Sequence, residues 1–228
     1  MDILRFFPDA QIEGPTPLDG SMAMVGYSVR SRAFTKSFFS SFNEFCYNNS
    51  LSKRIIIFDV PYAYNDAADE GVSSPSKEMF NKASTIGDER VRMINNALGN
   101  ELNNSFITRW HEFDNSPLVG DLRKELKSAC AADYNLKYSL LTETANRIHR
   151  NGFVTPEFFL NFLLQEIPIL CFLYYSLNYL IDVYPGTNFP IFKQIESGQW
   201  KGVLPLASSL ANGKRLTFIN TSGMNTCD

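Results

Sequence analysis

The sequence contains little cysteine and little histidine, and it lacks the common motifs of nucleotide-binding and hydrolytic enzymes. Its 4 cysteines and 2 histidines form no CxxC pair and no cluster, so we expect no metal site. The wide cysteine spacing gives no disulfide framework, which is typical of a reducing compartment. No GxSxG, Walker or GxGxxG motif occurs. The usual hydrolase, nucleotide-binding and dinucleotide-binding functions therefore find no support.

The amino-terminal residues lack the basic stretch and long apolar core of a secretory signal, so we expect a cytoplasmic protein. Positive charge is not in excess either, because 21 Lys and Arg against 24 Asp and Glu give a net charge of −3. Such a chain repels phosphate overall, so general DNA binding is not expected. A nucleic acid could bind only at a local basic patch.

Apolar and aromatic residues, in contrast, are plentiful. Hydrophobic residues make up 44% of the 228 positions, with 19 Phe and 10 Tyr. This composition excludes disorder as the general state and is sufficient for a full core. We expect residues 1–228 to form a single α/β domain.

The first third of the chain predicts a strand–helix–strand unit. Residues 22–27 and 54–60 are short apolar runs that resemble strands buried on both faces, which is typical of a parallel sheet. Between them, aromatic residues recur at helical spacing, namely Phe34, Phe38, Phe42 and Phe45. The turn after the first strand is where open α/β sheets bind ligands.

The middle of the chain predicts further helices and one strand. The expected elements are a surface loop over 66–75, helices starting near Ser76 and spanning 88–102, a strand within 105–113, and helices over 118–136 and 138–150, the last closed by Gly152.

Residues 158–181 are apolar enough to resemble a membrane span, but they contain Glu166 and the helix-breaking Pro168. We therefore expect a buried core helix that starts at Thr155 and breaks near Pro168, with no membrane partner. A carboxylate among Phe, Leu and Ile has a raised pKa unless a cation or donor stabilises its charge. Glu166 is thus either a functional acid or part of a structural ion pair.

Three other residues also have two interpretations. Ser28 follows a buried strand and is either a rigidly held nucleophile or a helix cap. Gly26 permits close approach of a ligand or serves packing. Tyr184, followed by Pro185 and Gly186, lies at a cavity mouth or is merely interfacial.

These residues occur in an order that resembles the cyclodipeptide synthases over about residues 22–218. That family has a glycine, an aliphatic residue and a serine after its first strand, matched here by Gly26-Tyr27-Ser28. Its later aromatic-aliphatic-x-x-Glu-aliphatic-Pro motif is matched by Phe162-Leu163-Leu164-Gln165-Glu166-Ile167-Pro168, and its downstream tyrosine by Tyr184. Ser31 and Pro185 match the branch that has a variable residue and a Tyr-Pro pair.

The resemblance implies a Rossmann-like domain similar to the catalytic domain of class I aminoacyl-tRNA synthetases, with a central, mostly parallel sheet flanked by helices. It implies an aminoacyltransferase that makes a cyclic dipeptide from two aminoacyl-tRNAs, without cofactor or metal. Ser28 would become acylated and then carry a dipeptidyl group, Glu166 would hold the ammonium group, and Tyr184 would relay a proton. The substrate-binding residues it implies are Met24, Gly26, Ser31, Phe162, Ile169 and Pro185.

Two departures from the family pattern concern the pocket. Tyr27 replaces an aliphatic residue and is expected to reshape the pocket wall. Phe162 replaces a tyrosine that helps to hold the amino group, so Glu166 alone or a nearby tyrosine would have to supply that contact.

Transfer RNA would bind the helix after the second strand, through Lys82, Arg90 and Arg92, or alternatively Arg123, Lys124 and Lys127. We expect a monomer. A non-catalytic Rossmann-like binding module and, less favoured, a serine esterase are the competing functions. The amino acids used cannot be identified from the sequence, because folding brings the pocket side chains together.

Overall fold

The computed structural model describes residues 2–17, 20–29, 34–98, 106–148 and 155–222. Its strands are β1 (Gln11–Glu13), β2 (Ala23–Ser28), β3 (Lys53–Phe58), β4 (Ile107–Arg109), β5 (Ile181–Tyr184) and β6 (Thr217–Asn220). Its helices are α1 (Lys36–Asn48), α2 (Asp59–Asp69), α3 (Lys77–Leu98), α4 (His111–Asp114), α5 (Pro117–Ala132), α6 (Tyr134–Ile148), α7 (Pro156–Cys171), α8 (Pro190–Glu196) and α9 (Pro205–Leu210).

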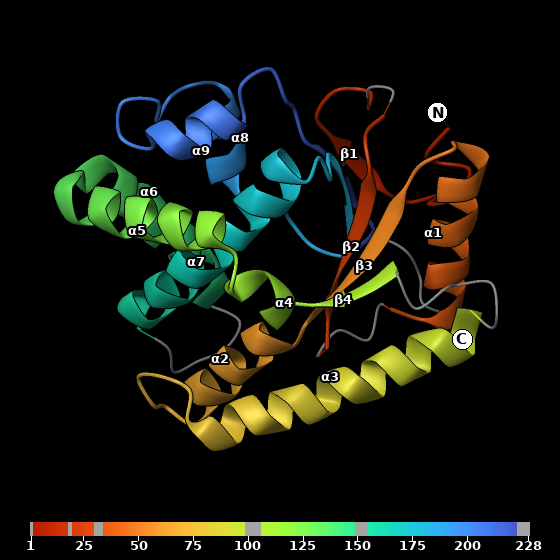
Figure 1. Ribbon diagram of the computed structural model, residues 1–228, viewed down its shortest axis with the longest axis horizontal. Helices are drawn as coiled ribbons and strands as arrows, with labels where there is room; N and C mark the ends of the chain where they lie inside the picture. Colours follow the sequence, from red (N-terminus) through yellow and green to blue (C-terminus); the bar gives the residue numbers. More distant parts are fainter. Residues whose placement is uncertain (1, 18–19, 30–33, 99–105, 149–154, 223–228) are drawn as a thin grey trace.

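The strands form one six-stranded sheet in the order β1-β6-β5-β2-β3-β4, with helices on both faces (Figure 1). Strand β1 is antiparallel to β6, and the other neighbouring pairs are parallel. A mostly parallel sheet flanked by helices was expected from the apolar runs at β2 and β3, and the structure confirms it.

The central strand β2 separates two hydrophobic clusters because its side chains alternate. Ala23, Val25 and Tyr27 belong to the cluster that contains the buried face of α1, which we call the α1 side. Met24 belongs to the cluster built around α5, α6 and α7, which we call the α7 side. Gly26 and Ser28 share the side of Met24 by alternation.

Helix α1 begins where Thr35, not Ser28, provides the cap. Thr35 Oγ1 accepts a hydrogen bond from the Phe38 N–H at 3.2 Å, which satisfies one of the free N–H groups of the first turn. Ser28 ends β2 well before this point, so the interpretation of Ser28 as the cap of this helix is wrong. The predicted aromatic stripe of α1 is confirmed, since Phe38, Phe42 and Phe45 are buried.

Helices α2 and α3 differ from the sequence prediction. The predicted loop over 66–75 is wrong in its first part, because α2 continues to Asp69 and packs Ala63, Ala67 and Ala68 against α3. The two helices predicted after residue 76 are one helix, α3. Gly87 lies within this continuous helix. A side chain at this position would collide with the guanidinium of Arg109.

The following elements are shorter than predicted. The strand within 105–113 is limited to β4, and α4 follows it directly. The helix predicted over 118–136 is divided into α5 and α6 at Asp133, whose Oδ1 accepts a hydrogen bond from the Leu136 N–H at 2.9 Å. Gly152 lies outside the described residues.

Helix α7 does not break at Pro168, contrary to the prediction. It continues to Cys171 and then into a π-helical turn over Phe172–Ser176. The segment Pro156–Ser176 has the length and apolarity of a membrane span, yet 78% of its most apolar window is buried inside the structure. Helices α5 and α6 pack against it, so α7 is a central core helix.

Candidate active site

A cavity of about 610 Å³ lies where β2, α7 and the segment after β5 meet. It contains three residues that the sequence singled out as reactive, Ser28, Glu166 and Tyr184, together with Phe162 and Pro185. They come from three separate stretches of the chain. The carboxyl ends of β2 and β5 converge here, as expected for a ligand site in a parallel sheet.

Ser28 is the last residue of β2 and is half-buried at the cavity wall. The register pairs it with Phe58, the last residue of β3, which lines the same cavity. Thr35, and not Ser28, caps α1. The Ser28 hydroxyl therefore lies at the cavity without a capping role for that helix.

Gly26 leaves room for the ring of Phe58. A Cβ atom at Gly26 would lie 2.7 Å from Phe58 Cζ, which is closer than real contacts allow. Phe58 also packs edge-on against Trp110, with ring centroids 4.8 Å apart. The glycine therefore makes room for an aromatic wall of the cavity, which is its packing role, and Gly26 itself is not among the residues that line the cavity.

Helix α7 contributes Glu166 and Phe162 to the cavity. Glu166 is 7% exposed, so its carboxyl group is in an environment of low dielectric constant where interactions with charge are strong. Phe162 packs against Tyr64 with ring centroids 5.6 Å apart. Tyr62 of α2 also lines the cavity. The cavity therefore includes a tyrosine side chain, although Phe162 itself lacks the hydroxyl group.

Tyr184 and the turn after it form the wall nearest β5. The Gly186 N–H donates a hydrogen bond to the Tyr184 carbonyl at 3.0 Å. A Cβ atom at Gly186 would lie 2.6 Å from Tyr184 Cε1, so the glycine allows the tyrosine ring to fold back over the turn. Tyr184 also contacts Phe34 with ring centroids 6.2 Å apart.

A second buried carboxyl group, Asp182, lies on β5 on the α7 side. The Tyr174 hydroxyl donates a hydrogen bond to Asp182 Oδ2 at 2.5 Å. Burial raises the pKa of Asp182 to about 7, and the hydrogen bond from Tyr174 offsets this in part. The pKa of Tyr174 is well above its usual value, mainly through burial, with the nearby charges of Asp182 and Glu166 contributing.

Three implied pocket residues are placed elsewhere or are not described. Met24 and Ile169 are fully buried in the core of the α7 side and are not among the residues that line the cavity. Ser31 lies outside the described residues. The expectation for Tyr27 is wrong, because alternation turns it to the α1 side, where its ring contacts Phe34 at 4.6 Å.

Sequence reasoning missed several residues that line the cavity. Pro61, Tyr62 and Asn65 come from α2, part of which was predicted as a loop. The signal was present, since Asp59 and Pro61 are typical of a first helical turn and Ala63, Ala67 and Ala68 favour helix. Glu143 of α6 and Asn188 before α8 also line it, and only the tertiary fold brings them there.

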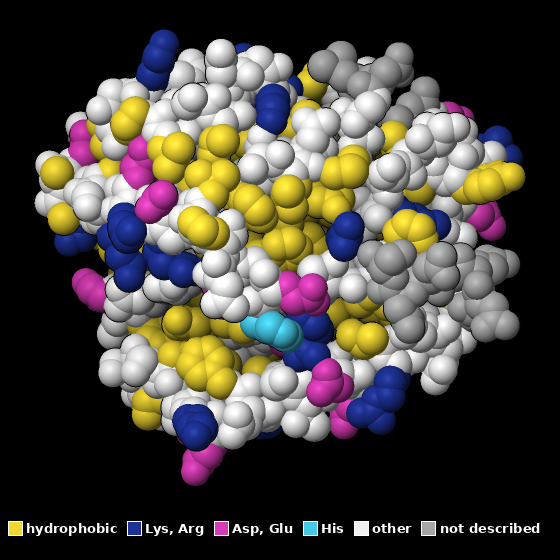
Figure 2. Space-filling model, in the orientation of Figure 1, with side chains coloured by type: hydrophobic (Ala, Val, Ile, Leu, Met, Phe, Trp, Pro, Cys, Tyr) yellow, Lys and Arg dark blue, Asp and Glu magenta, His cyan; other side chains and the backbone are white. Residues whose placement is uncertain are grey.

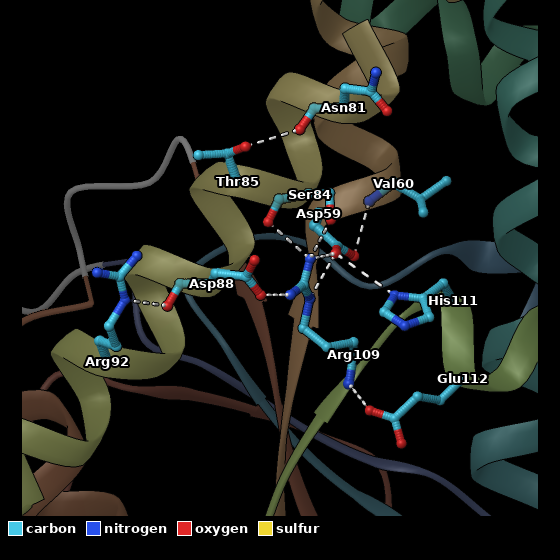
Figure 3. Close-up of polar contacts among 10 residues, drawn as sticks. All are labelled: Asp59, Val60, Asn81, Ser84, Thr85, Asp88, Arg92, Arg109, His111 and Glu112. Carbon is cyan, nitrogen blue, oxygen red and sulfur yellow. Dashed lines mark hydrogen bonds and ion pairs between the residues drawn. The ribbon is translucent and has the colours of Figure 1, made fainter. Parts of the chain in front are cut away.

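A cluster around Arg109 holds α2 and α3 to the edge of the sheet (Figure 3). The Arg109 guanidinium donates to both Asp59 and Asp88, and to the Ser84 carbonyl at 3.0 Å. Asp59 is 2% exposed and begins α2, where a carboxylate also favours the helix dipole. This cluster fixes the helix that carries Tyr62 and Asn65 next to the cavity.

The basic residues expected to bind tRNA all lie on α3 but differ in their surroundings. Lys82 is 57% exposed and pairs with Asp66 at 2.6 Å. Arg90 is half-buried and donates to the Val29 carbonyl at 3.3 Å, while the exposed Arg92 donates to the Asp88 carbonyl at 3.4 Å.

The alternative basic group on α5 is also engaged with acids. Arg123 pairs with Asp114 at 2.9 Å and Lys124 with Asp121 at 3.2 Å. Figure 2 shows Lys and Arg scattered among Asp and Glu over the face in view, without one continuous basic patch. Within the described part of the chain, no group of three or more His, Cys, Asp or Glu residues could hold a metal ion.

Comparison with solved structures shows which fold this is. The chain is similar to a CDPS (cyclodipeptide synthase) from Fluoribacter dumoffii, with 14% identity, a TM-score of 0.65 and coverage of 92% of this chain and 96% of that one. A CDPS from Staphylococcus haemolyticus gives 15% identity, a TM-score of 0.64 and coverage of 88% and 89%.

A Mycobacterium tuberculosis protein, described as demonstrating that cyclodipeptide synthetases are related to type I tRNA synthetases, gives 15% identity, a TM-score of 0.64 and coverage of 82% and 84%. Neither the models of known protein families nor the sequences of characterised proteins match this chain. The chain has the fold of the cyclodipeptide synthases, which confirms at the level of fold the resemblance that its motifs indicated.

Proposed function

We propose that the protein is a cyclodipeptide synthase, an aminoacyltransferase that condenses the amino acids of two aminoacyl-tRNAs into a cyclic dipeptide. The observation that carries the proposal is one cavity, within this fold, that joins Ser28, Glu166 and Tyr184. Residues 1–228 would act as one catalytic domain. A monomer is sufficient, because all three groups come from a single chain.

In the first step Ser28 Oγ attacks the ester carbonyl of an aminoacyl-tRNA. The bond to the tRNA ribose oxygen breaks, that oxygen takes the serine proton, and an aminoacyl-serine ester forms. The incoming ester is already activated, so the step exchanges one ester for another and needs no nucleotide hydrolysis. Covalent attachment divides a condensation of two substrates into simpler steps.

In the second step the amine of the seryl-bound amino acid attacks the ester carbonyl of the second aminoacyl-tRNA. Only this direction leaves the dipeptide on Ser28, since attack by the second amine on the seryl ester would release Ser28 and leave dipeptidyl-tRNA. A dipeptidyl-serine and a free tRNA result. The new terminal amine then attacks the seryl ester, which closes the ring and restores the Ser28 hydroxyl.

Glu166 and Tyr184 would manage charge and protons in these steps. A carboxylate that is 7% exposed binds an ammonium group strongly, because a charge-assisted hydrogen bond is stronger where water is excluded. Glu166 would accept the proton that the ammonium must lose before it attacks. Tyr184, which lines the same cavity, would pass a proton to the departing ribose oxygen.

We also propose that α3 contributes to tRNA binding through Lys82, Arg90 and Arg92. The support is their position on the helix that packs against α2, a wall of the cavity. The three are not equivalent, because Arg90 is half-buried against the Val29 carbonyl whereas Arg92 is exposed. Arg92→Glu should therefore weaken tRNA binding at low salt without disturbing the turn that follows Ser28.

The function is tested by mixing the purified protein with a pool of total tRNA charged with the 20 amino acids. The expected result is release of uncharged tRNA together with one or a few cyclic dipeptides, identified by mass spectrometry. A binding module would retain the charged tRNA and form no product. A serine esterase would release free amino acids only.

A further inference from the structure

A second cavity, of about 510 Å³, adjoins the active-site cavity and has no role in the chemistry described above. Its lining includes Tyr138 and Thr142 of α6 and Trp200 after α8. The two cavities share Glu143 and Pro190, so they meet at one wall. The second cavity therefore begins where the lining of the active-site cavity ends.

The outer edge of this second cavity carries two exposed tyrosines that stack on each other. Tyr134 is 75% exposed and Tyr138 is 59% exposed. Their ring centroids are 6.0 Å apart with an interplanar angle of 20°. Residues separated by four positions lie on one face of a helix, so the two rings form a flat aromatic surface at the start of α6. We call Tyr134 and Tyr138 the tyrosine platform.

Exposed aromatic rings of this kind are typical of surfaces that bind unpaired nucleotides. Every base has a flat face, and stacking on an aromatic side chain stabilises it whatever its sequence. The exposed Lys137 lies between the two tyrosines in sequence and offers a cation for the phosphates of the strand. The platform and its lysine therefore match the chemistry of a single-stranded RNA end.

We propose that the tyrosine platform and the adjoining cavity bind the unpaired 3′ end of the second aminoacyl-tRNA. The proposal rests on the proposed function. In an aminoacyl-tRNA the reacting ester is attached to the terminal ribose, so the terminal base is one sugar away from the carbonyl. The cavity next to the platform adjoins the active-site cavity at Glu143 and Pro190, so the platform lies beyond the end of the cavity that contains Ser28.

The second tRNA, and not the first, is assigned here because of the space available. After the first transfer, the seryl-bound amino acid occupies the part of the cavity next to Ser28 and Glu166. The incoming amino acid would then lie toward Glu143, Asn188 and Pro190, and two of these residues also line the cavity beside Tyr138. Helices α2 and α3 lie on the other side of α7 from α6 and α8 (Figure 1), so the basic residues of α3 are on a different approach.

The test measures the two transfers separately in the full-length protein. Aminoacyl-Ser28 is formed first and followed by intact mass, and cyclic dipeptide is then measured as a function of the concentration of added charged tRNA. Tyr134→Ala and Tyr138→Ala should raise the apparent KM of the second transfer about 5- to 100-fold, the range for loss of one base stack. Formation of aminoacyl-Ser28 should be unchanged.

Three controls isolate stacking as the cause. Tyr47→Ala removes a tyrosine that is 83% exposed on α1 and should have no effect. Tyr138→Phe keeps the ring and should restore the parental KM. An amino acid cyanomethyl ester, which carries no nucleotide, should react with the aminoacyl-enzyme of the parent and of Tyr138→Ala at the same rate.

Each alternative result has a definite meaning. An unchanged KM in both alanine variants, or an effect on aminoacyl-Ser28 formation alone, would overturn the proposal while leaving the proposed function intact. Unaltered kinetics with a change of mass by light scattering would assign the platform to contact between two copies of the chain. A parent protein that makes neither adduct nor product would overturn the proposed function itself.

Discussion

The two faces of strand β2 have different surroundings and different roles. On the α1 side, Tyr27 packs among aromatic rings, with Phe34 at 4.6 Å and Phe39 at 5.7 Å between ring centroids. On the α7 side, Ser28 lines the cavity that contains Glu166, and Gly26 makes room for the ring of Phe58 in its wall. Side-chain alternation thus lets β2 hold Ser28 in place through the packing of its opposite face.

This difference predicts that substitutions on the two sides of β2 have different effects. Changes on the α1 side should alter the free energy of unfolding and leave the activity of folded molecules intact. Changes to the polar residues that line the cavity on the α7 side should alter activity and leave the unfolding temperature nearly intact. The substitutions below test this separation between effects on stability and effects on activity.

The largest effect is expected for Glu166→Gln. The substitution keeps the shape of the side chain but removes the negative charge that would hold the ammonium group, so product formation should fall about 10²- to 10³-fold. The unfolding temperature should stay within a few degrees of the parent. Glu157→Gln, at an exposed position of the same helix, is the matched control and should keep full activity.

Tyr27→Ala should give the opposite result. Truncation of a side chain that is 1% exposed leaves a cavity among aromatic rings and should cost about 3–4 kcal/mol of unfolding free energy. Turnover per folded molecule at low temperature should change less than threefold. Denaturant titration and product assay on the same sample check both statements, and loss of turnover with full stability would break the separation.

Asp182 marks the limit of the separation, because it is a carboxyl group of the α7 side that affects stability. Its pKa is about 7 in the folded protein against 3.8 for the ordinary group, so between about pH 4 and 7 the folded state holds a proton that the unfolded state has lost. The unfolding free energy contributed by this group therefore decreases as the pH rises through that window.

Asp182→Asn should remove this contribution. The fall in unfolding free energy between pH 5 and 8 should shrink by more than about 1 kcal/mol relative to the parent, as measured by denaturant titration at each pH. Asp121→Asn, at an exposed position, should leave the pH profile unchanged. A profile that is the same for Asp182→Asn and the parent would show that Asp182 is ionised in the folded state.

The smallest effect is expected for Phe162→Tyr. The added hydroxyl enters a cavity where Tyr62 already offers one, so turnover should rise or fall by no more than about threefold. If Tyr62 supplies the contact with the amino group, Tyr62→Phe should reduce turnover and the double variant with Phe162→Tyr should recover it. A large loss in Phe162→Tyr with unchanged stability would show a pocket shaped around phenylalanine.

The sequence predicted the parts of the fold that local pattern controls. The apolar runs of β2 and β3 and the aromatic stripe of α1 are confirmed, because burial on both faces and helical spacing leave a direct trace in the sequence. The order of Gly26, Ser28, Glu166 and Tyr184 indicated residues that the fold brings to one cavity, apart from Gly26, which acts through Phe58.

The parts that failed depend on tertiary contacts. The end of helix α2 was not predicted because Asp66 and the Gly, Ser and Pro residues after it favour a loop, whereas packing of Ala67 and Ala68 on α3 extends the helix to Asp69. Pro168 does not end α7, since a helix buried by its neighbours tolerates a residue that breaks an isolated one. Tyr27 belongs to the Gly-x-Ser motif, but the alternation of side chains along β2 turns it away from the cavity to the α1 side.

The central claim is that Ser28 is acylated by charged tRNA, and the mass of the intact protein tests it most directly. The parent should gain the mass of one aminoacyl group, located on Ser28 by peptide mapping, within the first turnover. Ser28→Ala should unfold like the parent but gain no mass and make no product, whereas Ser37→Ala, at an exposed position of α1, should behave as the parent does. Cyclic dipeptide formation by Ser28→Ala at the parental rate would contradict the account.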